Sequence, residues 1–361
     1  MSASRSPGPP EVPDSSGIPD SPDVSDSLEV SDSPEAPGSP EVPDSPELSV
    51  VIPTHDRVDV LPEVLDALEA QRGAPAFEVV VVDDGSGDGT AEYLAQRRFP
   101  PGWRFVRQHN RGPAAARNVG VEAARGRWVA FLGDDTVPDS GWLAAHFEAL
   151  TGERARAAAA QGRRVGVIGY TGWHPRMRLD PFLRYINEHG LQFGYALIED
   201  PTDVPFNFFY TSNLALEREL LLEEPFDLGF PYAAWEDIEV SYRLFERGFR
   251  LLYEPRARVA HLHPTTIERF CLRQEKAGYC AVVFHRRHPE LGGFLGLGPE
   301  GPPPVPDRRL EPVLRGLASA LLRLRLPLSL PGLWERVLRH HYVAGLHRGW
   351  KDLAGCGKGD S

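Results

Sequence analysis

A chain of 361 residues with 41% hydrophobic residues is long enough for one large domain, or two ordinary ones, with a real core. The formal charge is −12, but residues 1–47 hold eleven acidic residues against one arginine, which leaves −2 for the rest of the chain. A nearly neutral folded part gives no electrostatic reason to expect a nucleic-acid partner. Three cysteines without CxxC spacing argue against a disulfide framework or a zinc site and favour a reducing, cytoplasmic location.

Residues 1–47 repeat short variations of Ser-Pro-Glu and Val-Pro-Asp-Ser. This segment has no aromatic residue and few aliphatic ones, so it cannot bury enough apolar surface to offset the entropy lost on ordering. We interpret it as a disordered acidic tail. It lacks the basic start and apolar stretch of a secretory signal. Since the chain has no run of about 18 uncharged apolar residues, we expect no membrane-spanning helix.

From residue 48 the sequence alternates between strand and helix patterns. The apolar run LSVVIP precedes a stretch with helical apolar spacing over 61–68, and FEVVVVDD follows. Residues 103–107 predict the next strand, Pro113 opens a helix that closes before Gly126, and RWVAFL is a further strand. Apolar strands separated by helices are typical of an α/β fold with a mainly parallel sheet covered on both faces.

The later part of the chain divides into the end of this domain and a helical extension. RRVGVIGY and FRLLYEP predict further strands, and WEDIEVSYRLFERG predicts a helix that ends at Gly248. After about residue 265 the pattern is helical, beginning with the capping-box spacing of Thr265 and Glu268. We therefore expect an α/β domain over 48–265 and a helical extension over 266–361, with a Gly- and Pro-rich linker near 292–312.

Polar clusters follow three of the predicted strands. They are Thr54-His55-Asp56-Arg57, Asp83-Asp84-Gly85-Ser86 and Asp134-Asp135-Thr136. Ligands of parallel sheets bind beyond the carboxyl ends of the strands, so these clusters mark a candidate site. Adjacent carboxylates such as Asp134 and Asp135 repel each other and need either a cation or an exposed turn. The residues alone leave both explanations open.

Four stretches, in this order, resemble the inverting family 2 glycosyltransferases of GT-A fold: SVVIPTHDR, VVVVDDGSGDGT, NRGPAAARNVGVEAARGRWVAFLGDDTVP and FDLGFPYAAWEDIEVSYRL. The resemblance covers roughly residues 48–265. It implies transfer of a sugar from a nucleotide-diphosphate donor to an acceptor hydroxyl, with inversion at the anomeric carbon and with Mn²⁺ or Mg²⁺. A hard cation held by carboxylates stabilises the charge that develops on the leaving diphosphate. The acceptor would be a glycan, a lipid-linked molecule or another hydroxyl compound, as in polysaccharide biosynthesis.

The resemblance assigns Asp135 as a direct metal ligand and Asp134 as a contact to the ribose or to a metal-bound water. The family's most frequent motif is Asp-x-Asp, whereas Gly133 holds the first position here. Residues 258–261 resemble a stretch that supplies a histidine metal ligand, so His261 is the second expected ligand. His263, two residues later, is its rival.

The nucleotide is expected on the loops after the first strands. By the resemblance, Asp84 would hydrogen-bond the nucleobase, and UDP is the expected nucleotide because a carboxylate can accept from the imide N–H of uracil. Pro53, Thr54 and Arg57 lie on the neighbouring loop, and Arg117 begins the helix that follows, where it can approach the nucleotide or a phosphate. The alternatives are an ordinary turn at Asp84 and an ordinary surface position for Arg117.

Trp235-Glu236-Asp237 matches the family's ED motif. The resemblance makes Asp237 the general base that deprotonates the acceptor, while Glu236 positions the base or the acceptor. The helix dipole would also favour two acids in the first turn of a helix. Trp235, with Ser212 and Asn213 from the stretch that usually precedes this motif, is expected on the acceptor side, with simple packing as the alternative.

Other functions fit less well. A phosphoacceptor receiver domain would need a lone Asp after the third strand and a later Lys at a strand end, and neither is clear. A nucleotidyltransferase would need a Gly-rich, Lys-bearing phosphate loop, which VVIPTHDR is not. The remaining alternative is a non-catalytic nucleotide-sugar-binding module of the same fold.

The stretch EPVLRGLASALLRLRLPLSLPGLW combines leucines near helical spacing with three arginines. Such a segment can lie on an anionic membrane surface, which would place the protein at the inner face of the membrane. The interpretation that we favour from the sequence is packing against the α/β domain or a partner subunit. The sequence indicates no oligomeric state.

Overall fold

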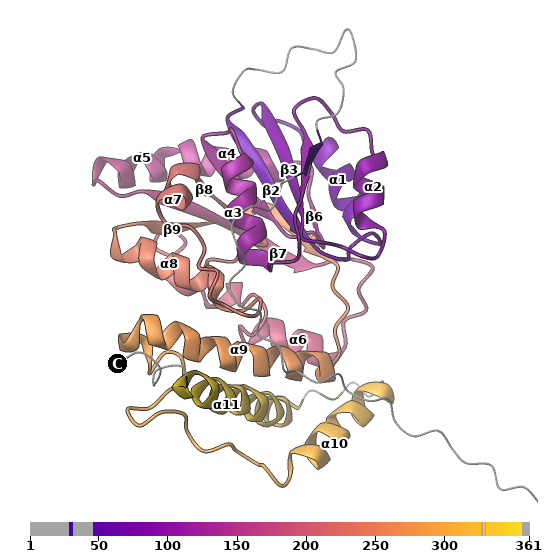
Figure 1. Cartoon of the computed structure of the whole chain (residues 1–361), viewed down its shortest axis with the longest axis vertical. Helices are drawn as coiled ribbons and strands as arrows, with labels where there is room; N and C mark the ends of the chain where they lie inside the picture. The colour runs from indigo at the N-terminus through magenta and orange to yellow at the C-terminus, as the bar shows by residue number, and fades with distance from the viewer. Residues whose placement is uncertain (1–28, 32–45, 326–327, 329, 356–361) are drawn as a thin grey trace, which may run out of the picture.

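The computed structural model describes residues 29–31, 46–325, 328 and 330–355. It has an α/β body and a layer of C-terminal helices beneath it (Figure 1). Within the described residues, nine strands form one sheet in the order β1-β4-β3-β2-β5-β8-β7-β9-β6. The strands are β1 (Glu29–Ser31), β2 (Leu48–Thr54), β3 (Phe77–Asp83), β4 (Arg104–Arg107), β5 (Trp128–Leu132), β6 (Thr136–Pro138), β7 (Val165–Trp173), β8 (Asn213–Glu217) and β9 (Arg250–His261).

The helices include those predicted over 61–68, from Pro113, over the WEDIEVSYRLFERG stretch and after residue 265, and others that were not predicted. They are α1 (Leu61–Glu69), α2 (Thr90–Gln96), α3 (Pro113–Ala123), α4 (Trp142–Thr151), α5 (Glu153–Ala160), α6 (Pro181–Glu188), α7 (Arg218–Glu223), α8 (Glu236–Glu246), α9 (Ile267–Arg287), α10 (Glu311–Arg323) and α11 (Pro331–Gly355). Short 3-10 helices occur at η1 (Tyr195–Leu197), η2 (Phe206–Phe208) and η3 (Pro289–Leu291).

The strands β4, β3, β2 and β5 are parallel and have helices on both faces. Alternate residues of β2 enter different cores: Ile52 packs with α1 and α4, whereas Val51 packs with α3 and α8. Burial on both faces explains why these strands read as continuous apolar runs. The predicted α/β class, with strands covered on both faces, is confirmed.

The other half of the sheet is mixed, and this arrangement builds the site. β8 runs antiparallel to both β5 and β7. The short strand β6 pairs antiparallel with the end of β9, which places His261 opposite Thr136. Because Thr136 follows Asp135 directly, the pairing brings the end of β9 next to the acidic pair.

The C-terminal layer consists of α9, α10 and α11, with α6 packed among them (Figure 1). Thr266 caps α9 by accepting a hydrogen bond from the N–H of Arg269, one residue later than the predicted capping box begins. At the crossing of α9 and α11 the backbones are in contact. A Cβ added to Gly278 would lie 2.0 Å from the carbonyl oxygen of Tyr342, and one added to Gly345 would lie 2.1 Å from that of Glu275.

Most of the predicted acidic tail lies outside the described residues. Its described part includes β1, which pairs antiparallel with β4 and forms the edge of the sheet. Backbone hydrogen bonds to an open sheet edge require no apolar side chains, which explains a short strand in a segment of this composition. Within the described part of the chain, no helix is long and apolar enough to cross a membrane.

Candidate active site

A cavity of about 1230 Å³ lies between the carboxyl ends of the parallel strands and the C-terminal helices. One wall comes from the loops after β2, β3 and β5, and the opposite wall comes from α6, α9 and α11. Most of the residues predicted from the sequence line it. These are Pro53, Thr54, Arg57, Asp84, Arg117, Asp134, Ser212, Trp235, Glu236, Asp237 and His261.

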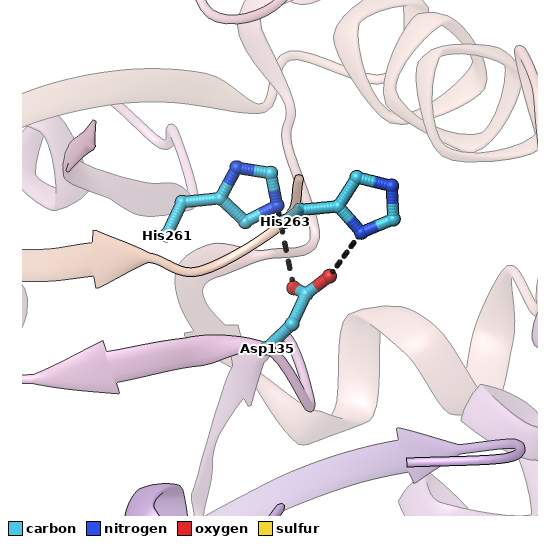
Figure 2. Close-up of side chains that lie close together, drawn as sticks. All are labelled: Asp135, His261 and His263. Atoms are coloured by element: carbon cyan, nitrogen blue, oxygen red, sulfur yellow. Dashed lines mark hydrogen bonds and ion pairs between the residues drawn. The ribbon is translucent and has the colours of Figure 1, made fainter. Parts of the chain in front are cut away.

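Asp135, His261 and His263 form a group whose ligand atoms lie within 4.8 Å of one another. Figure 2 shows both imidazoles directed at the Asp135 carboxylate. Nε2 of His261 lies 3.4 Å from Oδ1, and Nδ1 of His263 lies 2.9 Å from Oδ2. The two histidines that the sequence left as rivals are therefore together. Their spacing of two residues was a usable signal, because alternate residues of an extended chain share a face.

Neighbouring contacts hold this group in place. The N–H of Leu262 donates to the carbonyl oxygen of Asp135 at 2.8 Å. The ring of His261 stacks against Trp173 and His263, with centroids 5.6 Å and 5.4 Å away, and Phe193 meets it edge-on. Since Asp135 and His261 are each held by backbone pairing or ring packing, little conformational entropy remains to be lost when a ligand binds.

Arg57 reaches both acids of the pair. Its Nε lies 3.5 Å from Asp134 Oδ1, and its Nη2 lies 3.9 Å from Asp135 Oδ2. Burial, and then repulsion by Asp135, raise the pKa of Asp134 to about 7. Burial alone would raise the pKa of Asp135 too, but the hydrogen bonds and charges of His261 and His263 hold it below its ordinary value. The site therefore favours added positive charge.

Asp84 lines the cavity but is also engaged by the protein. One oxygen accepts from the side chain of Gln108 at 2.6 Å and from the N–H of Arg111 at 2.8 Å, and the other accepts from the N–H of Gly112 at 2.8 Å. Asp84 thereby fixes the loop that leads into α3. A carboxylate oxygen has two lone pairs, so the one bonded to Gly112 keeps capacity for a ligand donor.

Arg117 pairs with the ED motif. Its Nη1 donates to Oε1 of Glu236 at 2.8 Å, and the two side chains are only 12% and 5% exposed. Oε2 of Glu236 is buried and has no hydrogen-bond partner within the described residues. This ion pair joins α3 to the start of α8, so Arg117 acts on the ED motif whether or not it also contacts a nucleotide.

Asp237 is the most perturbed carboxyl group on this side of the cavity. Burial, and then the nearby charge of Glu236, raise the pKa of Asp237 to about 7. Its Oδ1 accepts from the N–H of Ile238 at 2.9 Å. The preceding residue, Trp235, has a φ of +71°, in the left-handed region that bulky residues avoid. Its indole donates to the carbonyl oxygen of Ala277, which anchors this turn against α9.

Residues 49–218 match the family model described as Glycosyl transferase family 2. The chain is 30% identical over 247 residues to the pre-mycofactocin glycosyltransferase of Mycobacterium tuberculosis, and the match covers 67% of this chain and 48% of that protein. Residues 49–218 therefore form a glycosyltransferase family 2 domain.

Other relatives agree with this family 2 assignment. The chain is 27% identical over 236 residues to a chondroitin synthase of Escherichia coli, and this match covers 56% of the chain and 32% of that protein. The chain thus spans half or less of the length of these curated relatives. A mannosyltransferase from Pyrobaculum calidifontis, solved with GDP-Man and Mn²⁺, superposes with a TM-score of 0.54 at 18% identity, covering 87% of this chain and 90% of that one. At this level of identity, the likeness shows that the two chains share a fold.

One residue predicted for the acceptor side of the family 2 domain packs in the core instead. Asn213 is fully buried and does not line the cavity. Its Oδ1 accepts from the indole of Trp142 and lies 2.8 Å from Nε2 of His146, and its Nδ2 donates to two backbone carbonyls. With these contacts its polar atoms are occupied, so the packing alternative holds for Asn213. Ser212 does line the cavity.

Sequence reasoning missed Arg273, a cavity-lining residue of α9. Its guanidinium lies over the ring of Phe270, and its side chain hydrogen-bonds Gln192. The side chain is exposed on the cavity wall, within reach of the charges of Asp237 and Glu236. Arg273 lies outside the family 2 motifs, in a helix rich in charged residues, so the sequence held no signal for it.

Proposed function

We propose that this chain is a metal-assisted inverting glycosyltransferase. It would move a sugar from a nucleotide-diphosphate donor, with UDP as the expected nucleotide, to a hydroxyl of a glycan or lipid-linked acceptor. The observation that carries the proposal is a single cavity lined both by His261 of the Asp135–His261–His263 group and by Asp237, a carboxyl group with a raised pKa. Metal-assisted displacement with a general base requires these two elements in one site.

The donor set of the metal group fits a divalent cation. It offers one carboxylate and two imidazoles, and imidazole ligands suit transition metals better than Mg²⁺, which prefers oxygen. We therefore favour Mn²⁺ over Mg²⁺, with Asp135, His261 and His263 as ligands and Asp134 nearby. Such a cation stabilises the negative charge that develops on the leaving diphosphate.

Asp237 is our proposed general base. A base works best when its pKa lies near the working pH, and the pKa of Asp237 is raised to about 7. Glu236 contributes to this effect through its charge, and its ion pair with Arg117 holds it beside Asp237. We assign to Asp237 the removal of the acceptor proton, and to Glu236 and Arg117 the maintenance of its basicity and position.

The donor half of the cavity is assigned to the loops after β2 and β3. Pro53, Thr54 and Asp84 line it, and Arg57 connects it to the acidic pair. This arrangement supports nucleotide binding beside the metal group, at the sheet edge where ligands of such sheets bind. The buried free cysteines Cys271 and Cys280 support a reducing, cytoplasmic environment.

Calorimetry with UDP, GDP and dTDP, with and without Mn²⁺, tests donor binding. We expect Mn²⁺ to tighten UDP binding about tenfold or more, and Asp135→Asn to remove this gain because it removes a ligand charge. Asp139→Asn is the matched control, since Asp139 is exposed and lies beyond β6. Equal affinity for the three nucleotides without any metal dependence would refute the assignment.

Turnover of a nucleotide sugar then separates an enzyme from a non-catalytic binding module. Asp237→Asn keeps the size of the side chain and removes its charge, so donor binding should persist while turnover falls about a hundredfold or more. Near-normal transfer by this variant would mean that another residue is the base, with Glu236 next in line. Nucleotide-sugar binding without any turnover by the parent protein would favour the binding module.

A further inference from the structure

Helix α10 and its flanks carry an exposed apolar face. Of the eleven large hydrophobic side chains that are exposed within the described residues, five lie between 310 and 328. They are Leu310 (52% exposed), Val313 (68%), Leu317 (50%), Leu324 (70%) and Leu328 (48%). Nearly half of the exposed apolar side chains thus come from one short segment, which marks it as an interaction surface.

A neighbouring face of α10 is anchored to the protein. Leu314, Ala318 and Leu322, spaced four residues apart, pack into the core shared with α6, α9 and α11. Leu310, Val313 and Leu317 are spaced by three and four residues and therefore lie on one separate face. Because its inner face is fixed, α10 presents its apolar outer face permanently, at the outer edge of the C-terminal layer (Figure 1).

The same segment is basic in a chain that is acidic as a whole. Between 307 and 325 it has five arginines and two acids, against a formal charge of −12 for the chain. Both acids are engaged: Asp307 pairs with Arg336, and Glu311 pairs with Arg315. No ion pair of Arg308, Arg309 or Arg325 occurs among the described residues.

An anionic lipid surface fits these features better than a protein does. Helices that lie in a membrane interface combine an apolar face with arginine-rich flanks, and each basic residue gains from anionic headgroups. A stable protein interface needs about 800 Å² per partner, whereas α10 has 13 residues and is therefore about 20 Å long. We propose that α10 docks on the surface of an anionic bilayer and lies in its plane. This proposal does not depend on the proposed function.

Sedimentation of the full chain with vesicles tests the proposal. The vesicles contain phosphatidylcholine alone or phosphatidylcholine with phosphatidylglycerol. We expect binding to the anionic vesicles only, weakened by salt, and reduced about fivefold for each flanking arginine removed, as in Arg308→Gln and Arg309→Gln. A combined Val313→Gln, Leu317→Gln and Leu324→Gln variant should lose binding about tenfold or more, because insertion scales with apolar area.

Leu222→Gln with Leu228→Gln is the matched control, since both leucines are exposed and lie outside this segment. It should bind like the parent, and thermal unfolding should show that all variants fold. Leu317→Trp adds a direct readout: its fluorescence should shift to the blue only with anionic vesicles. Unchanged binding of the triple variant, or equal binding to both kinds of vesicle, would overturn the proposal. So would a parent that ignores vesicles but self-associates through this face, seen as a dimer that the triple variant loses.

Discussion

Replacing Asp237 by Asn should stabilise the folded protein at alkaline pH. The carboxyl group has its pKa raised from 3.8 to about 7, so its charged form is disfavoured in the folded state. Below about pH 4 the group is protonated both folded and unfolded, and no penalty exists. As pH rises towards 7 the unfolded chain loses the proton first, so stability falls, and above 7 the full penalty applies.

The size of the effect follows from the same values. A difference of one in pKa corresponds to about 1.4 kcal/mol, so a change from 3.8 to about 7 limits the penalty to about 4 kcal/mol. Because the side chain is only partly buried, solvent screening reduces it, and we expect a gain of about 1–2 kcal/mol. Asn keeps an oxygen that can accept from the N–H of Ile238, so this hydrogen bond need not be lost.

Urea unfolding of the parent protein and of the Asp237→Asn variant, at pH 8 and at pH 5, measures the effect. The gain should be largest at pH 8 and smaller at pH 5, and Asp139→Asn should change the free energy of unfolding by less than about 0.5 kcal/mol. An Asp237→Asn variant that is no more stable than the parent at pH 8 would refute the argument that burial and Glu236 penalise this charge.

The rate of sugar transfer should depend on the ionisation of Asp237, so kcat/KM should fall about tenfold per pH unit below about 7; a flat profile from pH 5.5 to 8 would contradict this. His263→Ala should raise the Mn²⁺ concentration needed for donor binding about tenfold or more, with little effect on folding because the side chain is 44% exposed. A Mn²⁺ titration like that of the parent would show that His263 is no ligand. Arg273→Gln should lower kcat/KM about tenfold or more while leaving the melting temperature nearly unchanged, since an arginine near the reacting groups can bind a phosphate or an anionic acceptor. Steady-state kinetics checks this, and unaltered kinetics would place Arg273 outside the reacting region.

The sequence predicted the parallel half of the sheet well. Apolar runs buried on both faces, such as β2, and the helical spacing of α1 are local signals, so strand, helix and strand could be located without tertiary information. The strand β8 was not predicted, because it is short and lies in a stretch that we interpreted as part of the acceptor side. Its antiparallel direction also has no local signal, because an apolar pattern is the same for parallel and antiparallel strands.

The candidate site likewise has features that could be predicted from the sequence and features that could not. Acids at strand ends, such as Asp135, could be found because the ends of parallel strands meet at one edge of the sheet. The pairing of Arg117 with Glu236 joins residues 119 positions apart, and nothing in either local sequence distinguishes a buried ion pair from two surface charges. Asn213 was misassigned because a polar side chain in a motif looks the same whether it binds a ligand or bonds core groups.

The contact between α9 and α11 at Gly278 and Gly345 makes these helices one rigid wall. Since no side chain separates the two backbones there, a methyl group at either position would clash with the facing backbone and push the helices apart. Arg273 lies five residues before Gly278, about 7 Å along the helix, and Tyr342 lies three residues before Gly345. Both side chains line the cavity, so a substitution at either glycine would displace both of them. The width of the cavity on this side thus depends on the distance between two backbones as well as on the side chains that line it.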